Sequence, residues 1–468
     1  MSETKHIAID FGASSGRVIL GTFDGHKVEL EEVYRFANTP VEMNGVLYWD
    51  FPKLFQEIKN GLKAVSRITA EVESLAIDTW GVDFGYIDQN GHLLLLPKNY
   101  RNETKLKYQE AIYNRLSELE FYEETGVLPS SINSYVQLNA DLQEHPWLKE
   151  TIAHVLFMPD LFNYFLTQQT NVNYAIASTS GLLSTEQKWS TKVLETLGIP
   201  QHWFQQTDMT LHTILGPLTP SLAKETGLKD LQVIASAGHD TAASLISITD
   251  DDIFLSCGTW SVIGVQVNKP IVSKESYAAN FTNEGTAFGR IKFLKNINAL
   301  WVLQELQRYW AENGQMYSYS QLVEEAKHSD INSTVDLDDE CFLKRGNMEE
   351  IIDSYLNKNN QDLPKNAGDY VKVTLLSIAK KYSESVSEIE KITDRKFNRI
   401  RMVGGGIQNE LLCQMTAELT QKNVITGPIE ATSLGNVIGQ LKVLGFVNEE
   451  GIEGIVQNSV ELKSYKGI

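Results

Sequence analysis

Residues 6–23 read HIAIDFGASSGRVILGTF, and this stretch decides the fold. Runs of β-favouring residues stand on both sides of a short segment that contains Gly12 and Gly16. This pattern predicts a strand, a tight turn and a returning strand, because glycine adopts backbone angles that turns need. Asp10 ends the first strand, just before a turn of residues with small side chains. The chain therefore begins with a β-hairpin that carries an acidic residue beside its turn.

The same turn has the composition of a phosphate-binding loop. Small side chains let backbone N–H groups approach phosphate oxygens, and the hydroxyls of Ser14 and Ser15 add further donors. Asp10 can hold a hydrated magnesium ion near a transferred phosphate. An ordinary hairpin turn that needs glycine only for its shape is the alternative, and the residues alone leave both readings open.

A second glycine hairpin is predicted halfway along the chain, over residues 253–267. The motif SCGTWS at 256–261 echoes DFGASS at 10–15, with Gly12 and Gly258 separated by 246 positions (258 minus 12). A length of 468 residues with 42% apolar side chains also favours more than one domain. We therefore predict two domains, residues 1–244 and 245–468.

Elements between these hairpins predict an α/β fold. Apolar residues at helical spacing predict a helix over 54–66, and the apolar run 72–77 predicts a strand that leads into the motif DTWGVD at 78–83. In the second half, helices are predicted over 303–309, 370–392 and 409–419, and a strand over 400–403.

Asp240 is the candidate catalytic carboxylate. It lies in the motif SAGHDTAA at 236–243, between the apolar strand 233–235 and a helix-like run. Catalytic groups often stand at the carboxyl ends of strands in α/β sheets. An ordinary carboxylate at this place can accept a hydroxyl proton late in a phosphoryl transfer. The alternative is that Asp240 or Thr241 only caps the helix.

Two weaker signals involve glycine and carboxylate pairs. The triple glycine 404–406 between a strand and a helix can admit a nucleotide against the backbone, or can be a plain tight turn. It matches neither the Walker loop nor the dinucleotide fingerprint. Asp78 and Asp83 around Trp80 can bind sugar hydroxyls, or can satisfy donors of their own loop.

Composition narrows the class of protein. With 41 basic and 60 acidic residues the net charge is −19, which disfavours nucleic acid as a partner. The three cysteines form no close pair, and no segment has the pattern of a signal peptide or membrane span. We expect a cytoplasmic protein without a membrane partner, as a monomer or weak homodimer.

Taken together, the motifs resemble those of the FGGY carbohydrate kinases, which include glycerol kinase and xylulokinase. The resemblance covers nearly the whole chain. The segments that carry it are 10–17 (DFGASSGR), 77–84 (IDTWGVDF), 158–160 (MPD), 256–261 (SCGTWS), 280–285 (NFTNEG), 290–301 (RIKFLKNINALW) and 427–436 (GPIEATSLGN).

This resemblance implies two actin-like (ribonuclease H-like) α/β domains, a sugar-binding N-terminal one and a nucleotide-binding C-terminal one, with the active site in the cleft between them. It implies Asp240 as proton acceptor, with Mg²⁺ accompanying ATP near Asp10. The implied sugar contacts are Gly81, His239, Asp240, Thr241 and Asn296, and the implied ATP contacts are Ala13, Ser14, Ser15, Gly16, Arg17, Thr259, Gln304 and Gly405.

The implied reaction is transfer of the γ-phosphoryl group of ATP to the 1-hydroxyl of L-rhamnulose. The substrate can also be another ketose such as L-fuculose or L-xylulose, because a few hydrogen bonds recognise the stereochemistry of a sugar. At 101–104 (RNET) similar kinases more often have Arg-Asp and another Arg before Thr, and this departure around Asn102 and Thr104 also keeps the identity of the ketose open. An actin-like or chaperone-like ATPase switch that acts on a protein is the alternative from another class.

Overall fold

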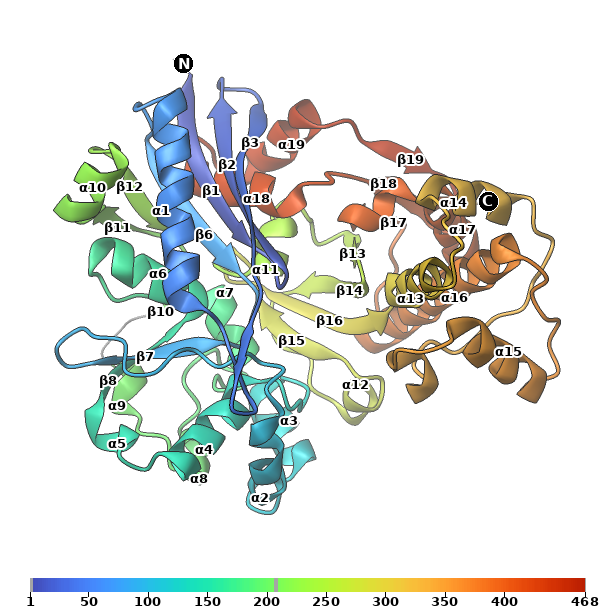
Figure 1. The fold of residues 1–468 in the computed structure, drawn as a ribbon, viewed down its shortest axis with the longest axis horizontal. Coiled ribbons are helices and arrows are strands. Elements are labelled where there is room, and N and C mark those ends of the chain that lie inside the picture. The colour runs from blue at the N-terminus through green and yellow to red at the C-terminus, as the bar shows by residue number, and fades with distance from the viewer. Residues whose placement is uncertain (1–2, 206–208, 468) are drawn as a thin grey trace. The chain divides into compact units, whose positions relative to one another are not determined.

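A computed structural model describes residues 3–205 and 209–467 (Figure 1). The chain forms two compact units, and each consists of segments that are not contiguous in the sequence. The first unit consists of Met1–Ser247, Val267–Phe293 and Ala431–Ser459. The second consists of Ile248–Gln266, Leu294–Glu430 and Val460–Ile468. Two segments from the second half of the chain thus belong to the first unit.

A six-stranded sheet forms the centre of the first unit, in the order β11-β12-β6-β1-β2-β3. The strands β12, β6 and β1 are parallel neighbours, so their carboxyl ends lie at the same edge of the sheet. The bounds are β1 Thr4–Phe11, β2 Ser15–Phe23, β3 Val28–Ala37, β6 Ser74–Thr79, β11 Thr213–Pro217 and β12 Gln232–Ala235.

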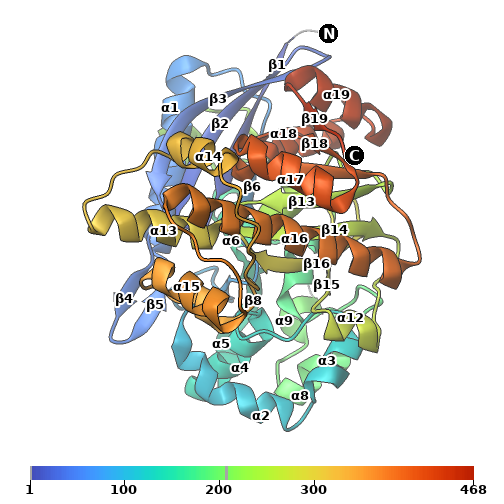
Figure 2. The ribbon, with the colours of Figure 1, turned by 90° about the vertical axis from the view of Figure 1, so that its right-hand side faces the viewer.

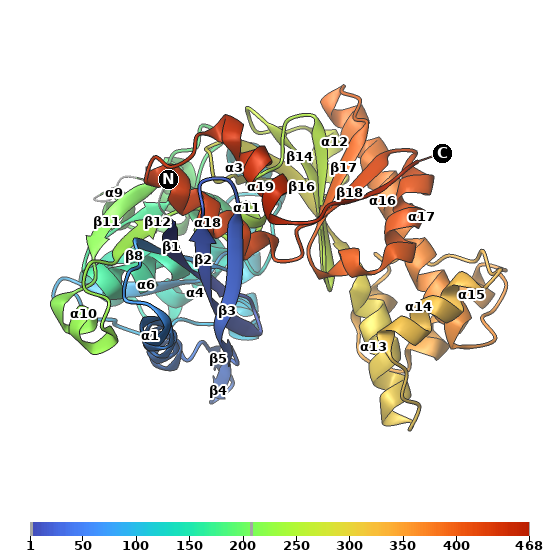
Figure 3. The ribbon, with the colours of Figure 1, turned by 90° about the horizontal axis from the view of Figure 1, so that it is seen from above.

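Two helices cover the two faces of this sheet (Figure 3). Helix α1 (Phe51–Ile68) packs so closely that a Cβ at Gly61 would lie 2.3 Å from Val18. Helix α18 (Ala431–Val443) brings Val437 to 2.7 Å from the Cβ position of Gly21. Val18 and Gly21 point to opposite faces because side chains alternate along a strand. The sheet is therefore buried on both sides.

A second apolar core of the first unit lies around β7 and β8. Tyr135, Phe157 and Trp203 are among its buried members. The bounds are β4 Val41–Met43, β5 Val46–Tyr48, β7 Phe84–Asp88, η1 Glu103–Tyr108, α2 Gln109–Tyr113, α3 Glu118–Thr125, α4 Ser134–Glu144, α5 Leu148–Thr151, β8 Ile152–Phe157, α6 Met158–Thr167, β9 Val172–Asn173, α7 Tyr174–Ala177, η2 Ser178–Ser180, α8 Thr191–Leu197, α9 His202–Gln205, β10 Met209–Thr210, α10 Pro220–Thr226, α11 Asp240–Ser244, α12 Lys274–Ala278, β15 Thr282–Gly285, η5 Glu449–Gly451 and α19 Ile452–Ser459.

The second unit has its own sheet, in which β16, β14, β13, β17, β18 and β19 follow one another. Helix α16 lies beside α17 and α14 (Figure 2). The bounds are β13 Asp252–Cys257, β14 Trp260–Val267, β16 Ile291–Asn298, α13 Leu300–Glu312, α14 Tyr319–Lys327, η3 Glu340–Leu343, α15 Met348–Lys358, α16 Ala367–Thr393, β17 Arg399–Val403, η4 Gly405–Gln408, α17 Glu410–Thr420, β18 Asn423–Thr426 and β19 Lys463–Tyr465.

These elements confirm the secondary structure predicted from periodicity. Both glycine hairpins form, as β1–β2 and as β13–β14. The helix expected over 54–66 is α1, and the long helix expected over 370–392 is α16. No helix in the described ranges combines the length and apolarity that crossing a membrane requires.

A glycine in α18 tests the packing of the first unit. A Cβ at Gly435 would lie 1.9 Å from the backbone oxygen of Ala243 in α11, and a backbone atom cannot move aside as a side chain can. We expect Gly435→Ala to lower the free energy of unfolding by roughly 1–3 kcal/mol, as overpacking does. Urea denaturation followed by circular dichroism measures this change.

The matched control is Gly454→Ala in α19, where nothing lies within 4 Å of the added Cβ. Alanine there should leave stability unchanged or raise it by roughly 0.5–1 kcal/mol, because alanine favours a helix interior. Equal urea midpoints for the two variants would contradict the close contact between α18 and α11.

Candidate active site

The carboxyl ends of three parallel strands bring the predicted residues of the first unit together. Asp10 on β1 stands in register with Asp78 on β6. At the end of β6, the backbone N–H of Thr79 donates to the carbonyl of Gly238 at 2.9 Å. Ligands in open α/β sheets bind at such an edge. The hairpin turn, the segment 78–81 and the segment 238–240 are therefore neighbours.

The predicted phosphate turn is held from outside by Asn38. Its side-chain amide donates to the Gly12 carbonyl at 2.8 Å, and its backbone N–H donates to the Ser14 carbonyl at 3.0 Å. A Cβ at Gly16 would lie 2.2 Å from the Phe36 ring. Gly16 is thus required by packing, while the backbone of Ala13 and Ser14 remains in a fixed, partly exposed turn.

Asp10 is buried and paired. Arg17, its partner across the hairpin, approaches Oδ2 at 2.5 Å, and the Ser433 hydroxyl donates to the same oxygen at 3.2 Å. Arg17 was predicted as an ATP contact, and the structure places its guanidinium on Asp10. A phosphate that bound here would meet a cation that already neutralises the neighbouring carboxylate.

Asp78 is a buried carboxylate with only one of its two oxygens hydrogen-bonded among the described residues. The Asn436 amide donates to Oδ2 at 2.5 Å, whereas Oδ1 is buried and has no hydrogen-bond partner among the described residues. Burial, with the nearby charges of Asp10 and Asp240, raises the pKa of Asp78 well above its usual value. A buried carboxylate oxygen without a partner is stabilised by a cation or by a proton.

This oxygen-rich surrounding fits a hydrated Mg²⁺. In the described part of the chain no three acidic, histidine or cysteine side chains are arranged to hold a metal directly. Mg²⁺ usually keeps several waters and binds through one or two carboxylates together with substrate phosphates. Asp10 and Asp78 supply donors of that type, so the fit is to an ion that arrives with the nucleotide.

Asp240 begins helix α11, with one carboxylate oxygen fixed. The backbone N–H and the hydroxyl of Thr241 both donate to Oδ1, at 2.5 and 3.1 Å. No described group donates to Oδ2. Burial and then the charge of Asp10 raise the pKa of Asp240 to about 6, although a third of the side chain (33%) stays exposed. Oδ2 is therefore the oxygen available to a substrate.

His239 stands between Asp240 and a buried ion pair. Its Nε2 lies 3.3 Å from Oδ1 of Asp240, and its Nδ1 lies 3.4 Å from Nζ of Lys292. Lys292 in turn pairs with Glu284 at 3.1 Å. Both partners lie in segments that carry the family resemblance, but the sequence assigned neither a role.

Gly81 lies in a turn with unusual backbone geometry. The next residue, Val82, has φ of 67°, a conformation that β-branched residues rarely adopt. Thr179 accepts a hydrogen bond from the Val82 N–H at 3.0 Å, and Ser134 donates to the Val82 carbonyl. Such strain persists only where the surroundings hold it, and it is common at ligand sites.

Asp83 supports this turn from behind. The carboxylate is fully buried and accepts hydrogen bonds from the indoles of Trp49 and Trp80 at 2.6 and 3.0 Å, from the Gln137 amide at 2.9 Å and from the Tyr100 backbone. Burial raises its pKa to about 6. Of the two readings of Asp83, the structure supports the one in which it satisfies donors of its own surroundings.

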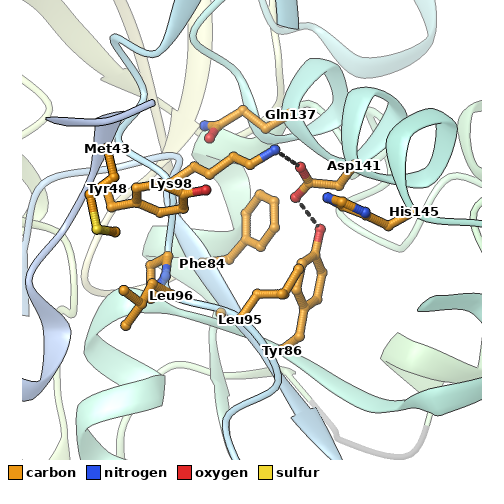
Figure 4. Close-up of a pocket in the computed structure, with 12 residues that line it drawn as sticks. Met43, Tyr48, Phe84, Tyr86, Leu95, Leu96, Lys98, Gln137, Asp141 and His145 are labelled. Carbon is orange, nitrogen blue, oxygen red and sulfur yellow. Dashed lines mark hydrogen bonds and ion pairs between the residues drawn. The ribbon is translucent and has the colours of Figure 1, made fainter. Parts of the chain in front are cut away.

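Behind the turn the first unit contains a cavity of about 200 Å³ (Figure 4). Phe84 and Tyr86 wall it, and Lys98 lies at its edge, paired with Asp141 at 2.7 Å. Gln137 borders the cavity and also holds Asp83. None of the site residues predicted from sequence lines this cavity, so it is separate from the candidate active site.

The second unit brings together three predicted ATP contacts. Thr259 and Gln304 are hydrogen-bonded through their side chains at 3.1 Å. The strands β13 and β17 are parallel neighbours, so the Thr259 turn and the triple glycine follow adjacent strand ends. Asn296, the predicted sugar contact of this unit, is exposed on β16.

The three glycines at 404–406 do different things. A Cβ at Gly406 would lie 2.2 Å from the Cys257 sulfur, and one at Gly404 would lie 2.8 Å from the Cys257 carbonyl. Packing against β13 therefore explains these two. Gly405 is exposed and nothing lies within 4 Å of its Cβ position, so it alone is free for the predicted nucleotide contact.

Sequence reasoning missed the residues that reach the site from far along the chain. Asn38 holds the hairpin turn, Ser433 and Asn436 bind the buried carboxylates, and Lys292 with Glu284 backs His239. All of these except Asn38 lie in segments that carry the family resemblance, and membership of such a segment was the only sequence signal that pointed to them. Asn38 had none.

Comparison with protein families accounts for both halves of the chain. Residues 6–247 match the N-terminal domain of the FGGY family of carbohydrate kinases, and residues 253–442 match its C-terminal domain. Similar curated proteins are rhamnulokinases from Halalkalibacterium halodurans, 37% identical with 98% of each chain covered, and from Bacteroides thetaiotaomicron, 36% identical with 98% of this chain and 95% of the relative covered.

Solved structures show the same fold at low identity. A ligand-bound xylulose kinase from Lactobacillus acidophilus has a TM-score of 0.83 at 14% identity, covering 99% of this chain and 94% of that one. A glycerol kinase from Plasmodium falciparum with ADP has a TM-score of 0.81 at 12% identity, with the same coverage.

Thr179 provides a test of how the strained turn is held. Thr179→Val removes the oxygen that accepts from the Val82 N–H and keeps the side-chain shape. A buried N–H left without an acceptor costs about 1–3 kcal/mol, so the free energy of unfolding should fall by that amount in urea denaturation. Thr179→Ser keeps the hydroxyl and should lose less than half as much. The hydrogen bond is unimportant if both variants unfold at the same midpoint.

Proposed function

We propose that this chain phosphorylates L-rhamnulose at its 1-hydroxyl, from the premise that the chain belongs to the FGGY family of carbohydrate kinases. The observation that carries the proposal is the similarity to curated rhamnulokinases of 37% and 36% identity over almost the whole length of each protein. The phosphate donor of this family is ATP. The products are L-rhamnulose 1-phosphate and ADP.

Asp240 acts as the proton acceptor in this proposal. Thr241 fixes Oδ1 with two hydrogen bonds, which leaves Oδ2 to accept the hydroxyl proton of the sugar. A raised pKa of about 6 still leaves most of the carboxylate ionised at neutral pH. Proton transfer comes late in a loose phosphoryl-transfer transition state, so this basicity suffices.

The hairpin turn binds the transferred phosphate in the same unit. Backbone N–H groups of Ala13, Ser14 and Ser15 meet the phosphate oxygens, and Asn38 holds their shape. Arg17 keeps the Asp10 carboxylate from repelling the nucleotide. Asp10 and Asp78 would hold Mg²⁺ through water, and the ion would neutralise charge on the phosphates.

We propose four sugar contacts besides Asp240. In the first unit, Gly81, His239 and Thr241 stand at the strand-end edge, with the turn at Gly81 held by Thr179. Asn296 is proposed as a further contact. The nucleotide contacts Thr259, Gln304 and Gly405 belong to the second unit. The interdomain cleft, the domain limits 1–244 and 245–468, a cytoplasmic location and a monomer or weak homodimer stay predictions.

A substrate panel tests the proposal directly. Purified protein with magnesium and ATP should release ADP fastest with L-rhamnulose, compared with L-fuculose, L-xylulose, D-xylulose and glycerol in a coupled assay. Preference for another ketose would retain the kinase and replace its substrate. ADP release that ignores every sugar would instead favour a nucleotide-dependent switch acting on a protein partner.

Asp240→Asn tests the catalytic assignment. The amide cannot accept the proton, so kcat should fall by at least about 100-fold, the contribution typical of a general base. ATP binding, measured by calorimetry, should stay within about twofold, because Asp240 is assigned to the sugar and not to the nucleotide. Turnover close to that of the unmodified protein would remove Asp240 from the mechanism.

A further inference from the structure

We propose that the buried pair of Lys292 and Glu284 locks His239 as the neutral tautomer with its proton on Nε2, so that His239 always presents a hydrogen-bond donor beside Asp240. Lys292 and Glu284 are positioning residues in this view, because they act through His239. The role of this tautomer in sugar binding rests on the proposed function. The fixed tautomer itself, here called the lock, is a property of the folded chain.

Burial makes this pair unusual. The Lys292 side chain is fully buried (0% exposed), and Glu284 keeps only 18% of its side-chain surface exposed. A buried ion pair is a poor source of stability, because desolvation of two charges offsets most of their attraction. Its position, 3.4 Å from the imidazole of a residue beside the catalytic carboxylate, indicates that it serves the imidazole.

The tautomer follows from the donors available. A lysine ammonium has three N–H donors and no acceptor, so Nδ1 of His239 must be the acceptor when Lys292 Nζ approaches it. Neutral imidazole carries one proton, which then resides on Nε2. Nε2 is the atom that lies 3.3 Å from Asp240 Oδ1. The lock therefore points an N–H towards the Asp240 carboxylate, on the side of Oδ1 and next to the oxygen left for the sugar.

Charge keeps the imidazole neutral as well. The titratable groups that face His239 are Asp240 at Nε2, and Lys292 and Glu284 (3.9 Å) at Nδ1. Burial, helped by the positive charge of Lys292, lowers the pKa of His239 well below its usual value. Without Lys292, the carboxylate of Glu284 would draw a proton to Nδ1, and the pKa of His239 would rise.

The lock matters because the two nitrogens offer opposite chemistry. With the proton on Nε2, His239 can donate a hydrogen bond to one sugar oxygen. Asp240 accepts the proton of the neighbouring hydroxyl. With the proton on Nδ1, Nε2 would turn a lone pair towards the Asp240 carboxylate and repel it. Asp240 and His239 thus form an acceptor and donor side by side, a pattern suited to two neighbouring oxygens of a ketose.

Nitrogen NMR reads the tautomer without any turnover. In protein labelled with ¹⁵N-histidine, His239 is assigned as the signal lost in His239→Gln. We expect the pattern of an Nε2–H tautomer that does not titrate between about pH 5.5 and about pH 8. In Lys292→Met the signal should titrate in this range, as a histidine released from a neighbouring cation does.

Kinetics should follow the same change. In Lys292→Met, kcat/KM for the sugar should fall by at least about tenfold at neutral pH, with the KM for ATP unchanged. The loss should grow as the pH falls from about 8 to about 6, because the pKa of His239 rises, and so does that of Asp240 once a nearby cation is gone. If the role of Lys292 were purely structural, kcat/KM would fall by the same factor at every pH.

Two further variants guard against misfolding. Lys292→Met combined with Glu284→Gln leaves no unpaired buried charge in this pair, so it should fold and keep His239 neutral. It should lower kcat/KM with a smaller acidic loss, because only the part that comes from Asp240 remains. Lys98→Met is the matched control: Lys98 is partly buried (14% exposed) and is bound to Asp141 (Figure 4) and to a second carboxylate of the first unit, Glu144. It should lower stability but leave the His239 signal and the pH profile unchanged.

The results separate this lock from the proposed function. An Nδ1–H or doubly protonated His239 in the unmodified protein would overturn the lock, as would a Lys292→Met protein with an unchanged signal and pH profile. If no ketose is phosphorylated while the His239 signal shifts in Lys292→Met as expected, the lock stands and the proposed function fails.

Discussion

Three carboxylates gathered at the carboxyl ends of three parallel strands are the constraint on which the first unit depends. Asp10 and Asp78 stand in register on adjacent strands, and Asp240 follows the next parallel strand. Buried like charges repel one another, so each carboxylate needs a partner. Arg17, Asn436 and Thr241 supply these partners. One oxygen, Oδ1 of Asp78, is left without a partner among the described residues.

The same unit satisfies buried charge in two different ways. Asp83 receives hydrogen bonds from two indoles and an amide, which makes it a rigid support for the turn at Gly81. Lys292 and Glu284 instead neutralise each other beside His239 and leave its Nε2 facing Asp240. Support of this kind, from residues behind a site, is what holds its functional groups in a fixed geometry.

Sequence patterns located the elements well and the supporting residues poorly. The hairpins around Gly12 and Gly258 and the helix α16 are evident from glycine placement and apolar periodicity, because both depend on neighbours a few residues apart. Asn38 and Ser433 are polar residues without a local pattern, and only the folded chain shows what they bind. For Asp83 the sequence left two readings, which burial decided.

By itself the sequence determined the α/β class, the two glycine hairpins and a family resemblance that names Asp10 and Asp240, because these depend on short motifs and local backbone preference. Only the tertiary structure decided that α18, from residues 431–443, covers the first sheet and binds Asp78 through Asn436. It also showed that Gly404 and Gly406 pack against Cys257, whereas nothing lies within 4 Å of the Cβ position of Gly405. Contacts between distant segments are set by packing of the whole chain, and no local pattern records them.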